Sequence, residues 1–309
     1  MLEKRSILAI VVTYYPGSGF AERFERLAGQ VDAVLIVDNN SSPEAVSMLR
    51  EAAARLEMHL IRNSDNLGVA AALNVGVAYA IANGYQWALL FDQDTAPGDN
   101  MVEGLREAYH AFLRTEKIAV IGSNYKESLN GRLHFPAPAT NGCSWREHRT
   151  VITSGSLVSL RAYREIGPFR DEFFADCVDH EYCLRARSKG FKVIMTTKPL
   201  MIHGVGQATS HRLLWKDVHP TNHSAWRHYY MIRNHTLLIR DYVLTEPVWA
   251  FTTLYALCKS VMVSYLFEED NFKKMTFCVL GLWDGLFSNF DRKIRLPWRT
   301  AVGPRHCAP

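Results

Sequence analysis

The chain has 309 residues, 48% of them hydrophobic and 21% charged, which is typical of a globular protein with one large α/β domain plus additions or two modest domains. A formal charge of +4 does not indicate nucleic-acid binding, but it suits an anionic substrate or an anionic lipid surface. None of the six cysteines forms a Cys-x-x-Cys pair, and residues 1–5 do not begin a secretory signal. We therefore expect a cytoplasmic protein with reduced thiols and no cysteine zinc site.

The first 125 residues alternate strand-like and helical patterns. Strands are expected at 6–13, 32–37, 58–62, 86–91 and 118–122, and helices at 20–27, 43–56, 69–82 and 97–113. This alternation is typical of an α/β fold with a parallel, doubly wound sheet, in which ligands bind at the carboxyl ends of the strands. Asp38 follows the second strand, and the pair Asp92 and Asp94 follows the fourth, so these carboxylates are expected at that edge.

Three large apolar residues, 89–91, run directly into two carboxylates, Asp92 and Asp94. Alternate side chains of a strand share a face, so the two carboxylates are expected to converge on one ligand. They would repel each other, and a hard divalent ion such as Mg²⁺ or Mn²⁺ would relieve that repulsion. A solvated acidic turn is the alternative, and this stretch alone does not decide between the two.

Asn66 and Gly68 precede an alanine-rich helix, and Asn74 lies within it. Gly68 would let the backbone approach a ligand closely, and the helix N-terminus offers N–H groups to an anion. The two asparagines could orient a nucleotide or its ribose; a capped helix packed on the sheet is the alternative. No Gly-x-Gly-x-x-Gly pattern follows the first strand, so a dinucleotide-binding site is not supported.

Beyond residue 125 the pattern is less regular. A loop or hairpin is expected at 128–149, an apolar stretch at 151–160, helices at 161–166 and 173–189, a strand at 191–196 and a turn at 201–206. Asp176 and Asp179 are three residues apart and are expected on one helix face. A carboxylate among aromatic and acidic residues can serve as a general base, although an acidic first helical turn is the alternative. His203 is either a metal ligand or a structural hydrogen bonder.

From about residue 221 the sequence becomes apolar and aromatic. A helix is expected at 225–244, where Arg233 could clamp a phosphate or lie on the surface. The segments 247–267 and 272–290 are strongly apolar, but Lys259 would lie near the bilayer centre if the first segment spanned a membrane alone. We expect two amphipathic helices that lie on a membrane surface or pack together; a buried hairpin and a transmembrane hairpin are the alternatives.

Eight motifs resemble glycosyltransferase family 2 and, within it, the bacterial rhamnosyltransferases. They are VVTYYP (11–16), VDNNS (37–41), NLGVAAALNVG (66–76), FDQDT (91–95), SGSLVS (154–159), VDHEYCLRA (178–186), IHGVG (202–206) and YYMIRN (229–234). The resemblance covers nearly the whole chain. It implies a GT-A fold over residues 1–220, with a nucleotide-sugar half (1–125) and an acceptor half (126–220), followed by a helical extension (221–309).

The resemblance also implies a set of roles for particular residues. Thr13, Tyr15 and Asp38 would hold the nucleoside of the donor. Further implied or candidate contacts to the nucleotide sugar are Asn66, Gly68, Asn74, Asp92 and Arg233. The candidate ligands of Mg²⁺ or Mn²⁺ are Asp92, Asp94 and His203. The candidate contacts to the acceptor are Trp145, Ser154, Gly155 and Asp176. Asp179 matches the general base of the family's Glu-Asp motif. Val178 replaces the preceding Glu, which leaves Asp176 open as an alternative base.

The implied reaction is an inverting transfer of rhamnose from dTDP-β-L-rhamnose to a hydroxyl of a glycan or lipid-linked acceptor, in cell-surface polysaccharide or glycolipid synthesis. A UDP- or GDP-linked donor is the alternative within the family. We expect the protein in the cytoplasm, peripheral on the cytoplasmic face of the inner membrane. Outside the family, Asp-x-Asp followed by Thr also fits a haloacid-dehalogenase-like phosphatase, although that class places its nucleophile after the first strand. A non-catalytic sugar-nucleotide-binding protein is a third possibility.

Overall fold

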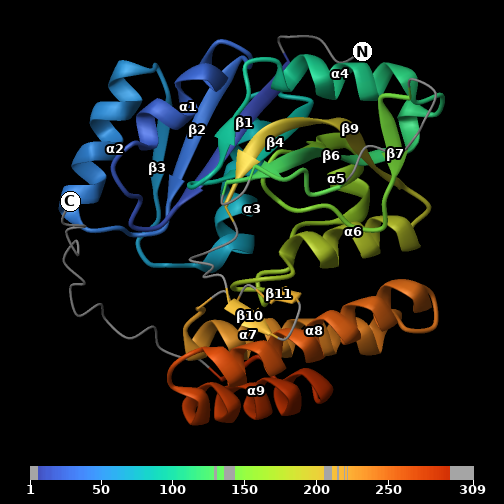
Figure 1. Cartoon of the computed structure of the whole chain (residues 1–309). Coiled ribbons are helices and arrows are strands. Elements are labelled where there is room, and N and C mark those ends of the chain that lie inside the picture. Colours follow the sequence, from blue (N-terminus) through green and yellow to red (C-terminus); the bar gives the residue numbers. More distant parts are fainter. Residues whose placement is uncertain are drawn as a thin grey trace.

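The computed structural model describes residues 6–128, 131–135, 143–204, 211–213, 216–218, 220 and 222–292. A twisted sheet flanked by helices forms one part of the molecule, and a layer of three long helices lies beside it (Figure 1). Parts of the predicted 128–149 loop and the end of the predicted 201–206 turn lie outside the described residues.

The main sheet has the strand order β3-β2-β1-β4-β8-β6-β9-β5, with β7 paired to β9. Its strands are β1 (Ile7–Thr13), β2 (Ala33–Asp38), β3 (His59–Arg62), β4 (Trp87–Asp92), β5 (Ala96–Pro97), β6 (Ile118–Glu127), β7 (Trp145–Glu147), β8 (Ser156–Ser159) and β9 (Lys192–His203). The short strands β10 (His211–Leu213) and β11 (Lys216–Val218) form a separate antiparallel pair.

The predicted parallel sheet is correct for β1 to β4 but incomplete beyond them. β1 runs parallel to β2 and β4, whereas β8 inserts antiparallel between β4 and β6. Residues 156–159 supply this strand from the apolar stretch that the sequence left unassigned, because Gly155 has a positive φ of 74° that turns the chain before it. The sheet is therefore mainly parallel with an antiparallel insertion.

Helices cover both faces of the sheet. They are α1 (Phe20–Ala28), α2 (Pro43–Arg55), α3 (Gly68–Ala82), α4 (Met101–Ala111), α5 (Leu160–Ile166) and α6 (Val178–Ser188). Side chains of β1 alternate between two cores: Leu8 and Ile10 pack with α3, α5 and α6, whereas Ile7 and Ala9 pack with α1, α2 and α4. Burial on both faces explains the continuous apolar runs of the central strands.

Several boundaries differ from the sequence predictions, for example the end of β6, which runs to Glu127 rather than to residue 122. Pro97 belongs to β5, so the helix predicted from residue 97 begins only at Met101. β9 continues to His203, which places this histidine at a strand end rather than in a turn. The helix predicted at 173–189 begins at Val178, because Asp176 and Cys177 have φ values of 59° and 62°. The prediction that Asp176 and Asp179 share a helix face was therefore wrong.

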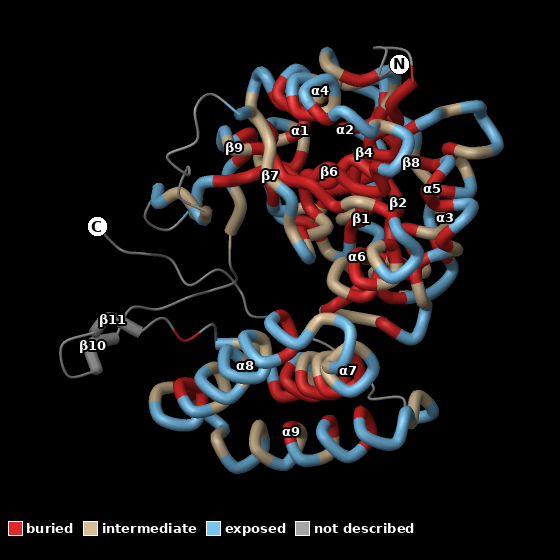
Figure 2. The backbone as a smooth tube through the Cα atoms, turned by 90° about the vertical axis from the view of Figure 1, so that its right-hand side faces the viewer, coloured by how far each residue is buried: buried red, intermediate tan, exposed pale blue. Residues whose placement is uncertain are grey.

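The helical layer consists of α7 (Ala225–Tyr242), α8 (Pro247–Phe267) and α9 (Asn271–Leu286). In Figure 2 α7 is largely red, whereas α8 and α9 are mostly exposed. Leu237 and Leu238 of α7 and Trp249 of α8 join the core on the α6 side of the sheet. Within the described part of the chain, α8 is the one helix long and apolar enough to cross a membrane, by length and composition only.

Gly68 at the start of α3 is constrained by packing as well as by backbone conformation. Its φ is +83°, and a Cβ there would lie 2.6 Å from the Phe174 carbonyl oxygen, which accepts a hydrogen bond from Val69. Gly84 has a similar φ of +79° with nothing near its missing Cβ, which makes it a matched control.

We expect Gly68→Ala to lower the free energy of unfolding by about 2 kcal/mol or more, because it combines backbone strain with a clash against backbone atoms. Gly84→Ala should lower the free energy of unfolding by only about 1 kcal/mol, because backbone strain is its single cost. Urea unfolding of both variants measures the difference. Equal losses would contradict the close packing of Gly68 against Phe174.

Candidate active site

A cavity of about 590 Å³ opens between the sheet and the helical layer. Its walls come from the ends of β1, β4 and β9, the loop that enters α3, the segment 174–180 around the start of α6, and residues of and before α7. The cavity thus lies at the carboxyl edge of the parallel strands, where the fold predicts a ligand. Asp92, Asp94, Asp176 and Asp179 all line it.

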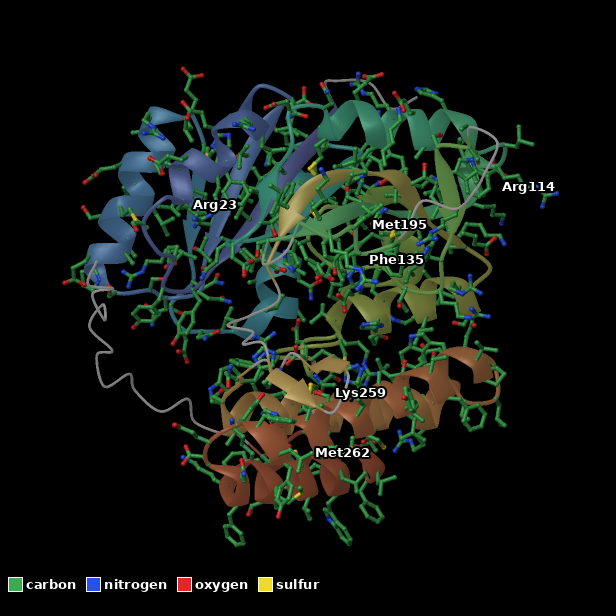
Figure 3. All side chains as sticks on the ribbon, in the orientation of Figure 1. Arg23, Arg114, Phe135, Met195, Lys259 and Met262 are labelled. Carbon is green, nitrogen blue, oxygen red and sulfur yellow. The ribbon has the colours of Figure 1, made fainter. Side chains whose placement is uncertain are left out.

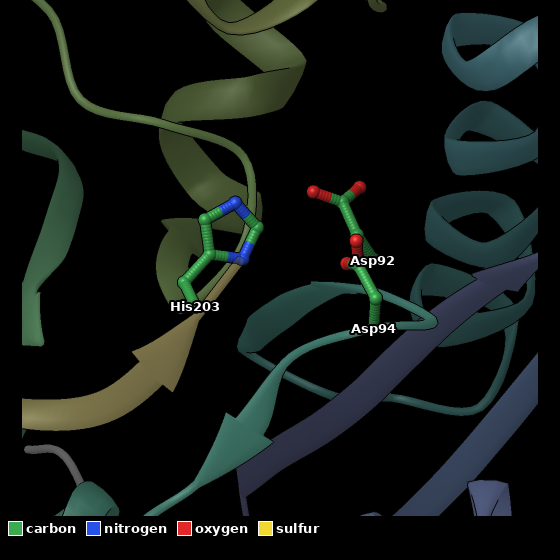
Figure 4. Close-up of side chains that lie close together, drawn as sticks. All are labelled: Asp92, Asp94 and His203. Carbon is green, nitrogen blue, oxygen red and sulfur yellow. The ribbon is translucent and has the colours of Figure 1, made fainter. Parts of the chain in front are cut away.

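Asp92, Asp94 and His203 bring their donor atoms together within 4.8 Å of one another (Figure 4). Asp92 ends β4, Asp94 follows it after one residue, and His203 ends β9 on the other side of the cavity. Two carboxylates and an imidazole form a donor set that Mn²⁺ accepts readily and Mg²⁺ accepts through its carboxylates. The three residues that the sequence nominated as metal ligands are therefore neighbours.

A buried hydrogen-bond chain holds this cluster in place. The Nδ1 atom of His203 lies 2.8 Å from the Thr95 hydroxyl, which lies 2.5 Å from the Ser154 hydroxyl. Ser154 also accepts a hydrogen bond from the backbone N–H of Asp92. With Nδ1 hydrogen bonded to Thr95, the Nε2 atom remains for an ion, as is usual for metal-binding histidines. Thr95 and Ser154 thus support the candidate metal ligands, a role that the sequence did not reveal.

The electrostatics of the cluster favour a cation. Withdrawal from water raises the pKa of Asp92 to about 7, and the negative charges of Asp94 and then Asp179 contribute to the rise. Burial lowers the pKa of His203, which favours the neutral imidazole, the form that can ligate a metal. A divalent cation would offset the repulsion between the carboxylates, so the residues present fit Mg²⁺ or Mn²⁺.

Asp179 lies in the first turn of α6 and faces the same cavity. Its two carboxylate oxygens accept hydrogen bonds from the backbone N–H groups of Thr153, at 3.1 Å, and His180, at 2.7 Å. These bonds fix the carboxylate in position while its remaining lone pairs stay available to a hydroxyl in the cavity. A carboxylate fixed in this way can take a proton from a hydroxyl group that enters the cavity.

Asp176 stands beside Asp179 but has a different partner. One of its oxygens lies 3.3 Å from the guanidinium of Arg227, and the other is buried without a hydrogen bond. Among the described residues that line the cavity, Arg227 is the one Lys or Arg. His223 lies beside it, and burial lowers the pKa of this histidine to about 4, with a further contribution from Arg227. The sequence nominated neither Arg227 nor His223.

The three predicted nucleoside residues differ in their relation to the cavity. Thr13 lines the cavity and donates to a carboxylate oxygen of Asp38, which is fully buried and also accepts two hydrogen bonds from Ser41. Asp38 therefore supports the wall from behind. Tyr14 rather than Tyr15 lines the cavity, and the N–H group of Tyr15 donates to Ser41. Asn66 and Gly68 line the cavity as predicted.

Gln93, between the two aspartates, fastens the metal loop to the loop after β1. Its side-chain amide accepts a hydrogen bond from the Tyr14 N–H at 2.8 Å and donates one to the Tyr14 carbonyl at 3.2 Å. Arg23 of α1 adds a bond to the Gln93 carbonyl. These bonds tie the loop after β1 to the loop after β4.

Four nominated residues have structural contacts away from the cavity wall. Asn74 binds the segment 163–171 to α3 through hydrogen bonds to Tyr163, Phe169 and Asp171. Trp145 packs on Phe112, and Gly155 packs on Met201. Arg233 is buried against Tyr230 and donates hydrogen bonds to Asn234 and to the Glu172 carbonyl. Sequence spacing cannot tell whether such a side chain faces the ligand or the protein.

Comparisons with known proteins agree with this geometry. The sequence profile of Glycosyl transferase family 2 matches residues 9–164, about half of the chain. A protein named dTDP-rhamnosyl transferase RfbF, from Shigella flexneri, is 28% identical over 252 residues, which cover 76% of this chain and 80% of the relative.

Solved structures show the same fold. A mannosyltransferase from Pyrobaculum calidifontis, in complex with GDP-Man and Mn²⁺, has a TM-score of 0.57 at 12% identity and covers 93% of this chain and 88% of its own. S. aureus TarS residues 1–349, in complex with UDP-GlcNAc, have a TM-score of 0.53 at 14% identity, with coverages of 91% and 80%. This chain spans 44% of a longer TarS chain. The architecture is thus the GT-A fold.

The family match decides against the phosphatase alternative, because the aspartate pair follows β4 in a sheet of glycosyltransferase type. Fold, cavity and sequence profile lead to one assignment: this chain is a glycosyltransferase and belongs to Glycosyl transferase family 2.

Proposed function

We propose that the protein transfers a rhamnosyl residue from dTDP-β-L-rhamnose to a hydroxyl group of a glycan or lipid-linked acceptor, with inversion at the anomeric carbon. The observation that carries the reaction type is one cavity with a cation-binding cluster, Asp92, Asp94 and His203, and a separate fixed carboxylate, Asp179. The choice of donor is supported by the 28% identity to a dTDP-rhamnosyl transferase. UDP- and GDP-linked sugars remain the alternatives to be tested.

In the proposed reaction Asp179 takes the proton from the acceptor hydroxyl while that oxygen forms the new glycosidic bond. The bond from the anomeric carbon to the diphosphate oxygen breaks, and dTDP leaves with the electron pair. A divalent ion held by Asp92, Asp94 and His203 would supply positive charge for the diphosphate. Attack from the face opposite the leaving group converts a β-linked donor into an α-linked product without a covalent intermediate.

We assign to Arg227 the phosphate-binding role that the sequence analysis gave to Arg233. Its guanidinium is partly exposed on the cavity wall and is paired with Asp176. A diphosphate carries more negative charge than one carboxylate and offers bidentate acceptors, so it can recruit this guanidinium. Arg233 is 2% exposed and its hydrogen bonds are made within the protein.

We expect Arg227→Gln to weaken dTDP binding about tenfold or more through loss of a charge-assisted contact, with little change in stability. Arg233→Gln should instead lower the melting temperature, because it removes a buried, hydrogen-bonded cation. Calorimetry with dTDP and thermal unfolding of both variants separate the two effects. The opposite pattern would restore Arg233 as the phosphate-binding residue.

A donor screen tests the function itself. The purified protein is incubated with dTDP-rhamnose, UDP-linked and GDP-linked sugars in the presence of Mg²⁺ or Mn²⁺, and nucleotide release is measured. We expect release from dTDP-rhamnose that depends on the ion and on Asp179. Faster release from a UDP- or GDP-linked sugar would overturn the donor assignment, and no release from any donor would support a non-catalytic binding protein.

A further inference from the structure

Helix α9 is amphipathic, but it exposes its large apolar side chains and buries small and polar ones, the reverse of a helix in a soluble protein. Its buried side consists of Cys278, Gly281, Asp284 and Gly285, whereas Phe272 and Trp283 are 88% and 60% exposed. Soluble helices normally bury their large apolar residues and expose the polar ones. Here small residues and a carboxylate face the protein, and aromatic side chains face outward.

The small residues of α9 allow close packing on α7. A Cβ at Gly281 would lie 2.5 Å from the Tyr229 carbonyl, and one at Gly285 would lie 2.5 Å from the Arg233 carbonyl. Asp284 is fully buried but satisfied, since it accepts hydrogen bonds from the Tyr229 hydroxyl and Arg292. Close contact through glycines and internally satisfied polar groups are typical of helices that pack beside lipid.

Helix α8 carries a matching apolar stripe. Phe251, Tyr255 and Met262 recur at spacings that place them on one side of the helix, and they are 65%, 73% and 52% exposed. Further exposed apolar residues are Val248, Leu254, Tyr265 and Leu266 on α8 and Val279, Leu282, Leu286 and Phe287 on and after α9. Such a concentration is unusual for a monomer surface and marks an interaction site.

Charge indicates the kind of partner. The exposed charged residues within the two helices are lysines, Lys259 on α8 and Lys273 on α9, and Figure 3 shows Lys259 in this helical layer. Exposed Glu269 and Asp270 are confined to the turn between the helices. From residue 292 to 309 the sequence contains five Lys or Arg residues and no Asp or Glu. Apolar faces accompanied by basic residues suit a surface that is apolar inside and anionic outside.

We propose that the outward faces of α8 and α9 dock on an anionic lipid bilayer and lie along its surface. Trp283, Phe272, Phe251 and Tyr255 enter the headgroup and acyl boundary, and Lys259 extends its ammonium group to the phosphates. Lys259 at the middle of α8 disfavours insertion across the bilayer. This docking does not depend on the identity of the donor, and it would bring the cavity to the membrane from which a lipid-linked acceptor is presented.

The test uses flotation of the full chain with phosphatidylcholine vesicles that contain or lack phosphatidylglycerol. We expect binding to the anionic vesicles and much weaker binding to the neutral ones. The triple variant Phe251→Ser, Tyr255→Ser, Trp283→Ser should lower the affinity about a hundredfold, because three apolar side chains no longer leave water. Leu113→Ser removes a leucine that is 97% exposed and lies outside these helices, and this variant should bind like the wild type.

A second variant tests the proposal even if the triple variant does not fold. Lys259→Glu with Lys273→Glu changes exposed residues only and should weaken binding to anionic vesicles at least about tenfold. The oligomeric state of the wild type and of the triple variant is measured by light scattering. The proposal is overturned if the wild type does not float with anionic vesicles, if the triple variant floats equally well, or if the wild type is a dimer that the triple variant converts to a monomer. Unchanged dTDP binding by the triple variant would show that donor binding is independent of this surface.

Discussion

Replacement of Asp179 by asparagine is expected to lower turnover by about 10²–10⁴-fold and to leave donor binding intact, because it removes a general base. The single oxygen of the amide can keep the hydrogen bond from the backbone N–H of His180, whereas the backbone N–H of Thr153 loses its acceptor, so we expect a small loss of stability beside the loss of turnover. Single-turnover rates with dTDP-rhamnose measure the first effect, and calorimetry with dTDP measures the second.

Asp176→Asn is the matched control for this prediction. It removes an equivalent carboxylate three residues away, at a positive φ that asparagine tolerates. Because Asp176 pairs with Arg227, its loss should act on donor affinity rather than on the chemical step. A larger fall in turnover for Asp176→Asn than for Asp179→Asn would make Asp176 the base.

The central strands and helices could be predicted from the sequence because local patterns determine them. β1, β2 and β4 read as apolar runs since both of their faces are buried, and Ser42 with Pro43 marks the start of α2, where the Ser42 hydroxyl accepts a hydrogen bond from Ala45. The partners of β8 could not be predicted, because a four-residue strand takes its place from tertiary contacts rather than from periodicity.

Part of the candidate site could also be predicted, namely the residues whose positions depend on where a strand or helix ends. Asp92, Asp94 and Asp179 follow or begin elements whose ends face the cavity, so their positions follow from the fold. Arg227 and Arg233 lie on one helix in a similar sequence context, and only packing shows that the first faces the cavity and the second the protein interior. Ser154, a candidate acceptor residue in the sequence, is buried and hydrogen bonded to the backbone of Asp92 and to Thr95.

Replacement of Asp94 by alanine is expected to remove the support that Mg²⁺ or Mn²⁺ gives to dTDP binding. Loss of residues that only orient metal ligands typically costs 10–100-fold in metal affinity, so loss of a ligand should cost at least about a hundredfold. The wild type should bind dTDP more tightly with the ion than with a chelator, whereas Asp94→Ala should bind it equally weakly in both. Calorimetric titration with and without the ion provides the measurement.

Asp99→Ala controls for the change in charge, since it removes an exposed carboxylate from the same part of the chain without touching the cavity. It should retain the full effect of the ion. His203→Ala should act in the same direction as Asp94→Ala, because His203 completes the cluster from β9. If dTDP binding by Asp94→Ala still responded to the ion as in the wild type, the cation would have to lie elsewhere, and the hydrogen bonds through Thr95 and Ser154 would account for the position of His203 beside Asp92 without a metal.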